Sequence, residues 1–449
     1  MSEDKRTRAA TSEPLGGYSY PHDLAQFVQE RWKGLPEAIG DGDLLPDHAS
    51  LETFISACYH ASMFREEERP VTFRAILAPP NLFSYDGRPP EGLQRLDFSS
   101  PLSFNPHELR RLSVAADPQR TLIGVWSDEN GDEGLRIWGL INSGTRWLRD
   151  VQGGRRVGAP LPPATVIRVE APGRIEVSKG YELIGKLHAG KLAGSRLDLF
   201  ASKWLPVEFS QFRQTLIERH NVDRNRAQSL STDRWASLEP TLPKKISERM
   251  MKRVISMMRE ERHGGTIVFL PMEIPGDFSV SDFVDVKYRF ADSPQLSFPD
   301  LVVDILNRLA RVYGASDLRS SEPIGWQHFE ATTDDELGTL DEALFETAHL
   351  IAALAAVDGA VVLSKRHELL GFGGMISGRL PAVRKVARAL DLEGESIAEE
   401  ETGNVGARHR SAYRLVNALP GSVAIVISQD GGVRFVCQKN ARVTYWEQE

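Results

Sequence analysis

Three adjacent side chains near the C-terminus could bind an anion. Arg408, His409 and Arg410 follow a glycine turn and open the apolar helical pattern "RHRSAYRLV". An arginine guanidinium is a planar fork whose N–H groups match phosphate oxygens, and charged hydrogen bonds of this kind are strong. If these residues begin a helix, the amides of its first turn add to the anion site. A solvated basic helix start gives the same pattern, so the triplet alone leaves both interpretations open.

A single carboxylate stands in an unusual apolar setting. Asp358, in "AAVDGAVVL", lies between an Ala-rich helical pattern and an aliphatic strand. A carboxylate bounded by so much apolar surface needs a cation, a helix N-terminus or a backbone turn as its partner. Gly359 would let a ligand or another backbone approach closely. An ordinary turn aspartate followed by glycine is the alternative interpretation.

Helical and strand patterns alternate after residue 244, and they must position these groups. "RVISMMREERHGG" predicts a helix that ends at Gly264, and "TIVFL" predicts a buried strand. "DEALFETAHLIAALAAV" predicts a helix that leads into the strand "DGAVVLS". We also expect a helix over residues 380–392, where Val383, Val386 and Leu390 keep the helical period, and two closing strands, "SVAIVIS" and "GVRFVC". Such alternation favours helices packed on a mixed sheet.

Together the motifs resemble the diadenylate cyclase domain of the DNA-integrity-scanning-protein type. The resemblance rests on Asp358-Gly359-Ala360, on the later Gly-x-Arg-His-Arg that begins at Gly406, and on the aliphatic strand and acidic turn that follow. With the opening helix and strand, it covers about residues 244–449. It implies a mixed β-sheet wrapped by helices. Members of this family condense two ATP molecules into cyclic di-AMP, a second messenger of bacterial signalling, and release two pyrophosphates.

The resemblance implies a role for each motif residue. Asp358 and Asp430 would bind Mg²⁺ or Mn²⁺, and Asp358 would help to deprotonate the ribose 3′-hydroxyl. Arg408, His409 and Arg410 would hold the triphosphate and stabilise the leaving pyrophosphate. The other nucleotide-contacting residues would be Gly359, Ala360, Gly374, Gly406, Ala407 and Ser428. Two copies would face each other, so activity would require self-association into a face-to-face dimer or a larger assembly.

The chain departs from the family pattern at two places. Ala407 stands where the family usually has threonine, and Ser428-Gln429-Asp430 stands in place of Ser-Glu-Glu. Losing one hydrogen bond to a charged partner costs roughly 1.5–3 kcal/mol, or about 10- to 150-fold in rate. This leaves an alternative function open, in which a catalytically degenerate protein binds a nucleotide or a cyclic dinucleotide as a sensor.

The arrangement of the first 205 residues resembles that of a sensor region. Similar bacterial proteins carry a probable sensor ahead of a cyclase domain, which implies an unknown small ligand or protein as partner. The predicted fold class is α/β (α+β), and the long segment 275–340 is expected to cap the site or alter the dimer. The predicted parts are a disordered tail (1–17), a small α/β region (18–115), a β-rich barrel- or sandwich-like domain (116–205), a helical connector (206–243) and the cyclase-like domain (244–449).

Composition restricts the partners. The formal net charge is −8, so DNA binding is not expected. Cys58 and Cys437 are the only cysteines, which argues against a disulfide framework and a structural zinc site. The N-terminus has no apolar signal segment, and no apolar run is long enough to cross a bilayer. We therefore expect a cytoplasmic protein with no membrane partner.

Overall fold

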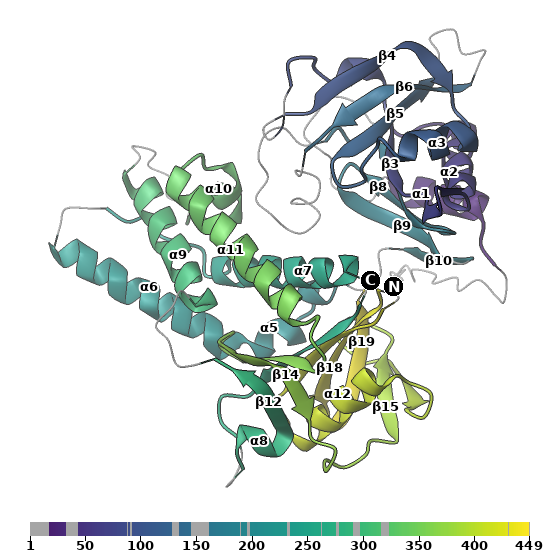
Figure 1. The fold of residues 1–449 in the computed structure, drawn as a ribbon. Coiled ribbons are helices and arrows are strands. Elements are labelled where there is room, and N and C mark those ends of the chain that lie inside the picture. The colour runs from purple at the N-terminus through teal and green to yellow at the C-terminus, as the bar shows by residue number, and fades with distance from the viewer. Residues whose placement is uncertain are drawn as a thin grey trace, which may run out of the picture. The chain divides into compact units, whose positions relative to one another are not determined.

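The chain divides into two compact units, each built on its own mixed sheet (Figure 1). One unit comprises Met1–Trp147 and Val157–Ser195, and the other comprises Leu148–Arg156 and Arg196–Glu449. The computed structural model describes residues 18–32, 44–87, 89, 92–127, 134–144, 161–188, 190–194, 198–230, 234–261, 263–274, 278–290, 297–315, 323–429 and 431–448. The predicted tail, residues 1–17, lies outside this range.

The N-terminal unit contains an eight-stranded sheet in the order β10-β9-β8-β7-β3-β5-β6-β4. Strands β3 and β5 are parallel, and the other neighbours are antiparallel. The elements are α1 (Pro21–Trp32), α2 (His48–Ser62), β1 (Arg65–Glu66), β2 (Arg69–Pro70), β3 (Phe73–Leu77), η1 (Pro80–Leu82), β4 (Gln94–Ser103), α3 (Pro106–Ser113), β5 (Thr121–Ser127), β6 (Leu135–Asn142), β7 (Thr165–Ala171), β8 (Arg174–Lys179), β9 (Glu182–His188) and β10 (Lys191–Gly194).

Helices α1, α2 and α3 pack on one face of this sheet. Leu24, Phe54 and Leu109, one from each helix, are fully buried in the same core as strand residues such as Phe73 and Ile123. The sheet is open, with β10 and β4 at its edges, so it does not close into the barrel considered for 116–205. Strands from 18–115 and from 116–205 share it, because β3 pairs with both β5 and β7.

The C-terminal unit contains a nine-stranded sheet in the order β12-β14-β13-β11-β17-β18-β19-β15-β16. The pairs β11–β13 and β15–β19 are parallel, so the sheet is mixed, as predicted. The elements are η2 (Leu199–Ala201), α5 (Trp204–Glu208), α6 (Ser210–Leu230), α7 (Leu242–Glu260), β11 (Gly265–Leu270), α8 (Val280–Phe283), β12 (Val284–Arg289), α9 (Phe298–Ala315), α10 (Trp326–Ala331), α11 (Asp335–Leu354), β13 (Ala360–Ser364), β14 (Leu369–Ile376), β15 (Lys385–Ala389), β16 (Ile397–Glu401), α12 (Ala407–Ala418), β17 (Val423–Ile427), β18 (Val433–Lys439) and β19 (Arg442–Gln448).

Side chains that alternate along the central strands belong to two hydrophobic cores, one on each face of the sheet. Ile267 and Val361 belong to a core with helices α7, α9 and α11, whereas Val268 and Val362 belong to a core with α12 on the opposite face. This alternation is the period of two that a β-strand imposes. The helices predicted before β11 and β13 are confirmed as α7 and α11. Helix α12 is fixed to its face by Tyr413 and Val416, both fully buried.

The structure corrects the prediction for one segment and shows which elements another segment contains. Residues 380–392 were expected to be helical, but Lys385–Ala389 form strand β15 and Leu390 is 54% exposed. Pairing with β16 and β19 on either side overrides the weak helical period of this segment. The described parts of 275–340 form α8, edge strand β12, α9, α10 and the start of α11, and α9 contributes Val302 and Leu306 to the core. This segment is therefore part of the folded framework.

Candidate functional site

The strand register brings distant motifs to one end of the C-terminal sheet. Strands β11 and β13 run parallel with Thr266 opposite Ala360, so Gly264 and Asp358 both lie just before the starts of neighbouring strands. Strand β17 runs antiparallel to β11, and its last residue, Ile427, pairs with Gly265. Ser428 follows directly. We call this end, marked by Gly264, Asp358 and Ser428, the candidate site end of the sheet.

Asp358 lies in the turn between α11 and β13 and is exposed. Its carboxylate makes no hydrogen bond or ion pair with any residue in the described part of the chain. Gly359 has a left-handed φ of +113°, and a Cβ there would lie 2.5 Å from the carbonyl carbon of Gly373. Ala360 is buried and pairs with Gly374 across the β13–β14 ladder. The DGA motif thus holds a carboxylate on a turn that requires glycine.

Arg408 reaches the same end of the sheet from helix α12. Helix α12 begins at Ala407 with Gly406 as its N-cap, so the predicted helix start is confirmed. The guanidinium Nη1 of Arg408 donates to the carbonyl oxygen of His263 at 3.2 Å. A Cβ on Gly264 would lie 2.9 Å from that nitrogen. Because Gly264 and Asp358 precede neighbouring parallel strands, Arg408 and Asp358 are brought to the same end of one sheet.

The cationic triplet does not act as one cluster in this structure. Consecutive helical residues are rotated by about 100°, so Arg408 and Arg410 point in very different directions. Arg410 is exposed and donates to the carbonyl of Val405, in the loop before the helix. His409 is half-buried, with its ring centroid 6.5 Å from that of Tyr413. Arg408 is therefore the member of the triplet that contacts the site end.

The predicted acidic turn is only partly described. Ser428 begins the β17–β18 turn, where its amide and its hydroxyl both donate to the carbonyl of Gly432, at 2.9 and 3.1 Å. Gln429 is exposed, and its backbone nitrogen would lie 3.2 Å from a Cβ placed on Gly264. Asp430, the second predicted metal ligand, lies outside the described residues. Ser428 and Gln429 thus border the same site end as Arg408.

Sequence reasoning missed His263, which contacts Arg408, and Glu261, which pairs with His263. The His263 ring Nε2 lies 2.9 Å from the Glu261 carboxylate, and the His263 backbone carbonyl accepts the hydrogen bond from Arg408. Both residues come from the α7–β11 connection. The signal was present in "REERHGG", which places titratable side chains directly before the two glycines that open the strand. A Cβ on the second of these, Gly265, would lie 2.8 Å from the backbone carbonyl oxygen of Ala355, so packing favours glycine at this position.

The donor chemistry at the site end suits a hard divalent cation. Mg²⁺ and Mn²⁺ prefer carboxylate, carbonyl, hydroxyl and water oxygens. Asp358 offers an exposed carboxylate at the start of β13 that pairs with no side chain in the described part of the chain. Asp430, the second ligand that the resemblance implied, lies outside the described residues. The Asp358 carboxylate is thus a donor of the type that the implied metal prefers.

A cavity lies at the opposite end of the sheet. It measures about 520 Å³ including its opening to solvent, and it is lined by the connector helices, α7 and sheet residues such as Phe269 and Phe435. His367, which follows β13, lies among aromatic rings, and burial lowers its pKa to about 3. None of the predicted site residues lines this cavity. Its lining is largely apolar, and its cationic side chains, Arg213 and Lys244, share it with the Glu248 carboxylate.

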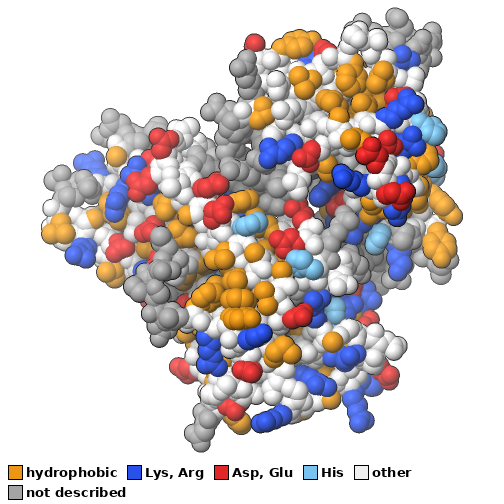
Figure 2. All heavy atoms as spheres, viewed as in Figure 1, with side chains coloured by type: hydrophobic (Ala, Val, Ile, Leu, Met, Phe, Trp, Pro, Cys, Tyr) orange, Lys and Arg blue, Asp and Glu red, His pale blue; other side chains and the backbone are white. Residues whose placement is uncertain are grey.

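Charges of both signs are interspersed on the face of the molecule that Figure 2 shows. No broad basic area is visible on that face, in keeping with the net charge of −8. Among the described residues, no helix combines the length and the apolar character needed to cross a membrane.

Comparison with known proteins gives one match. Residues 41–142 match the family model described as "Probable sensor domain DACNV". No curated protein matches the chain, and neither does any solved structure. The matched range runs from the α2 region to strand β6 and crosses the boundary that the sequence predicted at residue 115. The N-terminal unit therefore contains a stretch that matches a probable sensor domain.

Proposed function

We propose that the C-terminal unit is a diadenylate cyclase, which condenses two ATP molecules into cyclic di-AMP and two pyrophosphates under the control of the N-terminal sensor. The observation that carries this proposal is the placement of Asp358 and Arg408 at the same end of one sheet, although they come from separate motifs. The match of residues 41–142 to a probable sensor domain of the DACNV type gives indirect support.

Arg408 would bind and orient phosphate oxygens. The His263 carbonyl holds one of its N–H groups, which fixes the guanidinium at the sheet end and leaves its other donors for a ligand. Gly406 makes no side-chain cap at the start of α12, so an amide of the first turn such as that of Arg408 would add to the anion site. These donors would stabilise the negative charge that grows on the leaving pyrophosphate.

Asp358 would act on the attacking hydroxyl. A bound Mg²⁺ or Mn²⁺ would lower the pKa of the ribose 3′-hydroxyl and neutralise charge at the α-phosphate. Asp358 would hold the cation together with Asp430, which lies outside the described residues, and the Asp358 carboxylate would accept the hydroxyl proton. The left-handed turn at Gly359 keeps this carboxylate at the start of β13.

Catalysis would need two copies of the unit. Each ATP supplies a 3′-hydroxyl that attacks the α-phosphate of the other ATP, so two bound nucleotides must face each other. We therefore expect the rate per chain to rise with protein concentration until self-association is complete.

A catalytically degenerate nucleotide-binding sensor is the second candidate. Ala407, the first residue of α12, is exposed and brings no hydroxyl to the anion site, and Gln429 brings an amide where a carboxylate was expected. Such a protein would retain the Arg408 contacts and bind ATP or a cyclic dinucleotide without turnover.

One experiment separates the two. The full chain is incubated with ATP and MnCl₂ or MgCl₂, and products are resolved by chromatography while ATP binding is measured by calorimetry. We expect cyclic di-AMP from the wild type and none from Asp358→Asn. The matched control is Asp285→Asn, at an exposed aspartate on edge strand β12. ATP binding without product across all protein concentrations would favour the sensor. Absence of both, together with no binding of cyclic di-AMP in the same calorimetry, would reject both candidates.

A further inference from the structure

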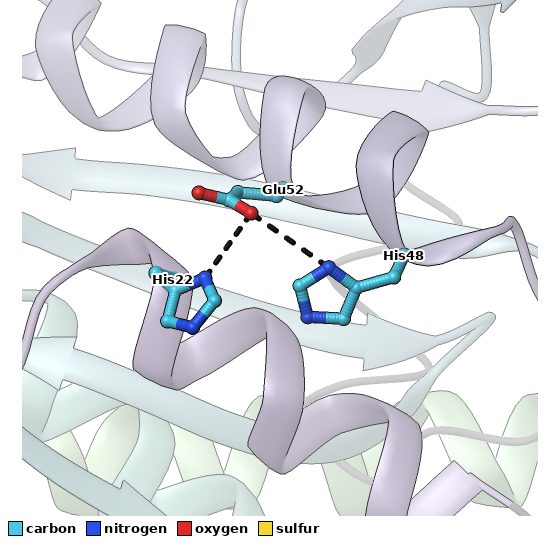
Figure 3. A group of neighbouring side chains, drawn as sticks. All are labelled: His22, His48 and Glu52. Atoms are coloured by element: carbon cyan, nitrogen blue, oxygen red, sulfur yellow. Dashed lines mark hydrogen bonds and ion pairs between the residues drawn. The ribbon is translucent and has the colours of Figure 1, made fainter.

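Three side chains of the N-terminal unit converge on one point (Figure 3). His22, His48 and Glu52 each offer a ligand atom, and these atoms all lie within 4.8 Å of one another. From this geometry we propose that they form a binding site for a divalent late transition metal, of which Zn²⁺ is the best match. The proposal does not depend on the cyclase assignment.

The fold holds the three ligands in place. His22 is the second residue of α1, His48 is the first residue of α2, and Glu52 lies one turn further along α2. The two helices pack through buried residues such as Leu24 and Phe54. Their first turns are therefore held together by the hydrophobic core, and the residue spacing of four in α2 places His48 and Glu52 on one face.

The separations match those of a tetrahedral zinc site. Zinc binds histidine nitrogen and carboxylate oxygen at about 2.0–2.2 Å, so two ligand atoms of a tetrahedral site lie roughly 3.3–3.5 Å apart. The Glu52 Oε2 atom lies 3.1 Å from His22 Nδ1 and 3.7 Å from His48 Nδ1. The two imidazole rings meet edge to face with centroids 5.4 Å apart, and both direct Nδ1 at the same carboxylate oxygen. Both oxygen–nitrogen distances lie within about 0.2 Å of that range.

The surroundings permit the charge of a cation. The positive ends of two helices would oppose it, but Asp23 and Asp47 in the same turns offset that field, and Asp47 already caps α2 through the Ser50 amide. The side chains of His22, His48 and Glu52 are 59%, 39% and 41% exposed, so a metal can enter from solvent. Three protein ligands leave a fourth position for water or an exogenous ligand.

A surface ion pair is the competing interpretation. One histidine beside one glutamate is common on protein surfaces and contributes little to stability. Here a second imidazole faces the same Glu52 oxygen, an arrangement that a metal site requires and a simple ion pair does not. His48 and Glu52 lie within the range that matches a probable sensor domain, whereas His22 precedes it. A metal here would link helix α1 to the segment that matches the sensor-domain model. The site needs no cysteine, in agreement with the low cysteine content.

The test uses the full chain with Zn²⁺ in calorimetry and with Co²⁺ in visible absorption. Tetrahedral Co²⁺ absorbs visible light much more strongly than octahedral Co²⁺. The variants are His22→Gln, His48→Gln and Glu52→Gln. The matched control is His60→Gln, which removes an exposed histidine from the last turn of α2. All four positions are on the surface, and circular dichroism with thermal melting verifies that each variant folds.

We expect one Zn²⁺ per chain that depends on the three ligands, together with a tetrahedral Co²⁺ spectrum. Removing even an outer-shell partner of a metal ligand costs about 10–100-fold in affinity, so loss of a direct ligand should weaken this site at least tenfold. His60→Gln should change the affinity by less than about twofold. The proposal is overturned if the three variants bind Zn²⁺ as the wild type does, or if Co²⁺ remains octahedral.

Discussion

Replacing Arg408 with lysine tests the proposed anion site most specifically. Lysine keeps the positive charge but lacks the planar fork that can contact the His263 carbonyl and a phosphate oxygen together. The substitution therefore removes about one charged hydrogen bond from the ligand, worth roughly 1.5–3 kcal/mol. This corresponds to a fall of about 10- to 150-fold in kcat/KM for cyclic di-AMP formation.

The assay follows pyrophosphate release and cyclic di-AMP by chromatography, with thermal melting beside it. Arg408 is only half-buried, so we expect the melting temperature to change little. The matched control is Arg414→Lys, in the same helix six residues later, which should leave the rate within about twofold of the wild type. If the wild type binds ATP without turnover, the same loss is read as a weaker Kd. A rate and a Kd for Arg408→Lys that equal those of the wild type would refute this role.

The other predictions concern the framework of the C-terminal unit. Gly359→Ala should lower the free energy of unfolding by roughly 1–3 kcal/mol or more, since φ is +113° and a Cβ would meet Gly373, and a denaturant midpoint equal to that of the wild type would contradict this. His367 has a pKa of about 3 in the folded state against about 6.5 when unfolded, so its neutral form contributes stability above pH 6.5 that is progressively lost as pH falls toward 3. Urea titrations of His367→Asn should show a flatter dependence of the free energy of unfolding on pH, because the titrating imidazole is removed. Asparagine is chosen because it tolerates the φ of +60° at this position. Asp341→Ala should cost roughly 3–5 kcal/mol by removing the carboxylate that lies 2.8 Å from buried Arg253, and a loss below about 1 kcal/mol in the same titration would argue against a structural ion pair.

Short-range patterns predicted most of the elements around the candidate site. The glycine turn before Arg408 and the apolar period after it placed the helix that the structure shows at Ala407–Ala418. The Ala-rich run before Asp358 and the aliphatic run after it likewise gave α11 and β13. These patterns are local, since the buried face of each element repeats within one or two turns or pleats.

Features that depend on pairing between distant segments could not be predicted. The segment around Val386 has an ambiguous period, and only its position between β16 and β19 makes it a strand. Strand β3 lies inside the N-terminal sheet between β5 and β7, although the strands directly before it in sequence, β1 and β2, form a separate two-stranded ladder. The motif RHR suggested one cation cluster, but the helical rotation sends Arg410 to the preceding loop.

Clusters made by tertiary packing were also invisible in the sequence. His22 and His48 lie 26 positions apart in the sequence, and only the packing of α1 on α2 brings both to Glu52. The partnership of Arg408 with the His263 carbonyl joins residues that lie 145 positions apart. The acceptor is a backbone carbonyl, which every residue has, so the residue types in the sequence cannot predict this contact.

The most direct test of the central claim is a structure of the protein with a non-hydrolysable ATP analogue and Mn²⁺. We predict the triphosphate against the Arg408 guanidinium and the first turn of α12, with the metal bound by the Asp358 carboxylate at the start of β13. A nucleotide bound elsewhere, with Arg408 and Asp358 both untouched, would contradict the account.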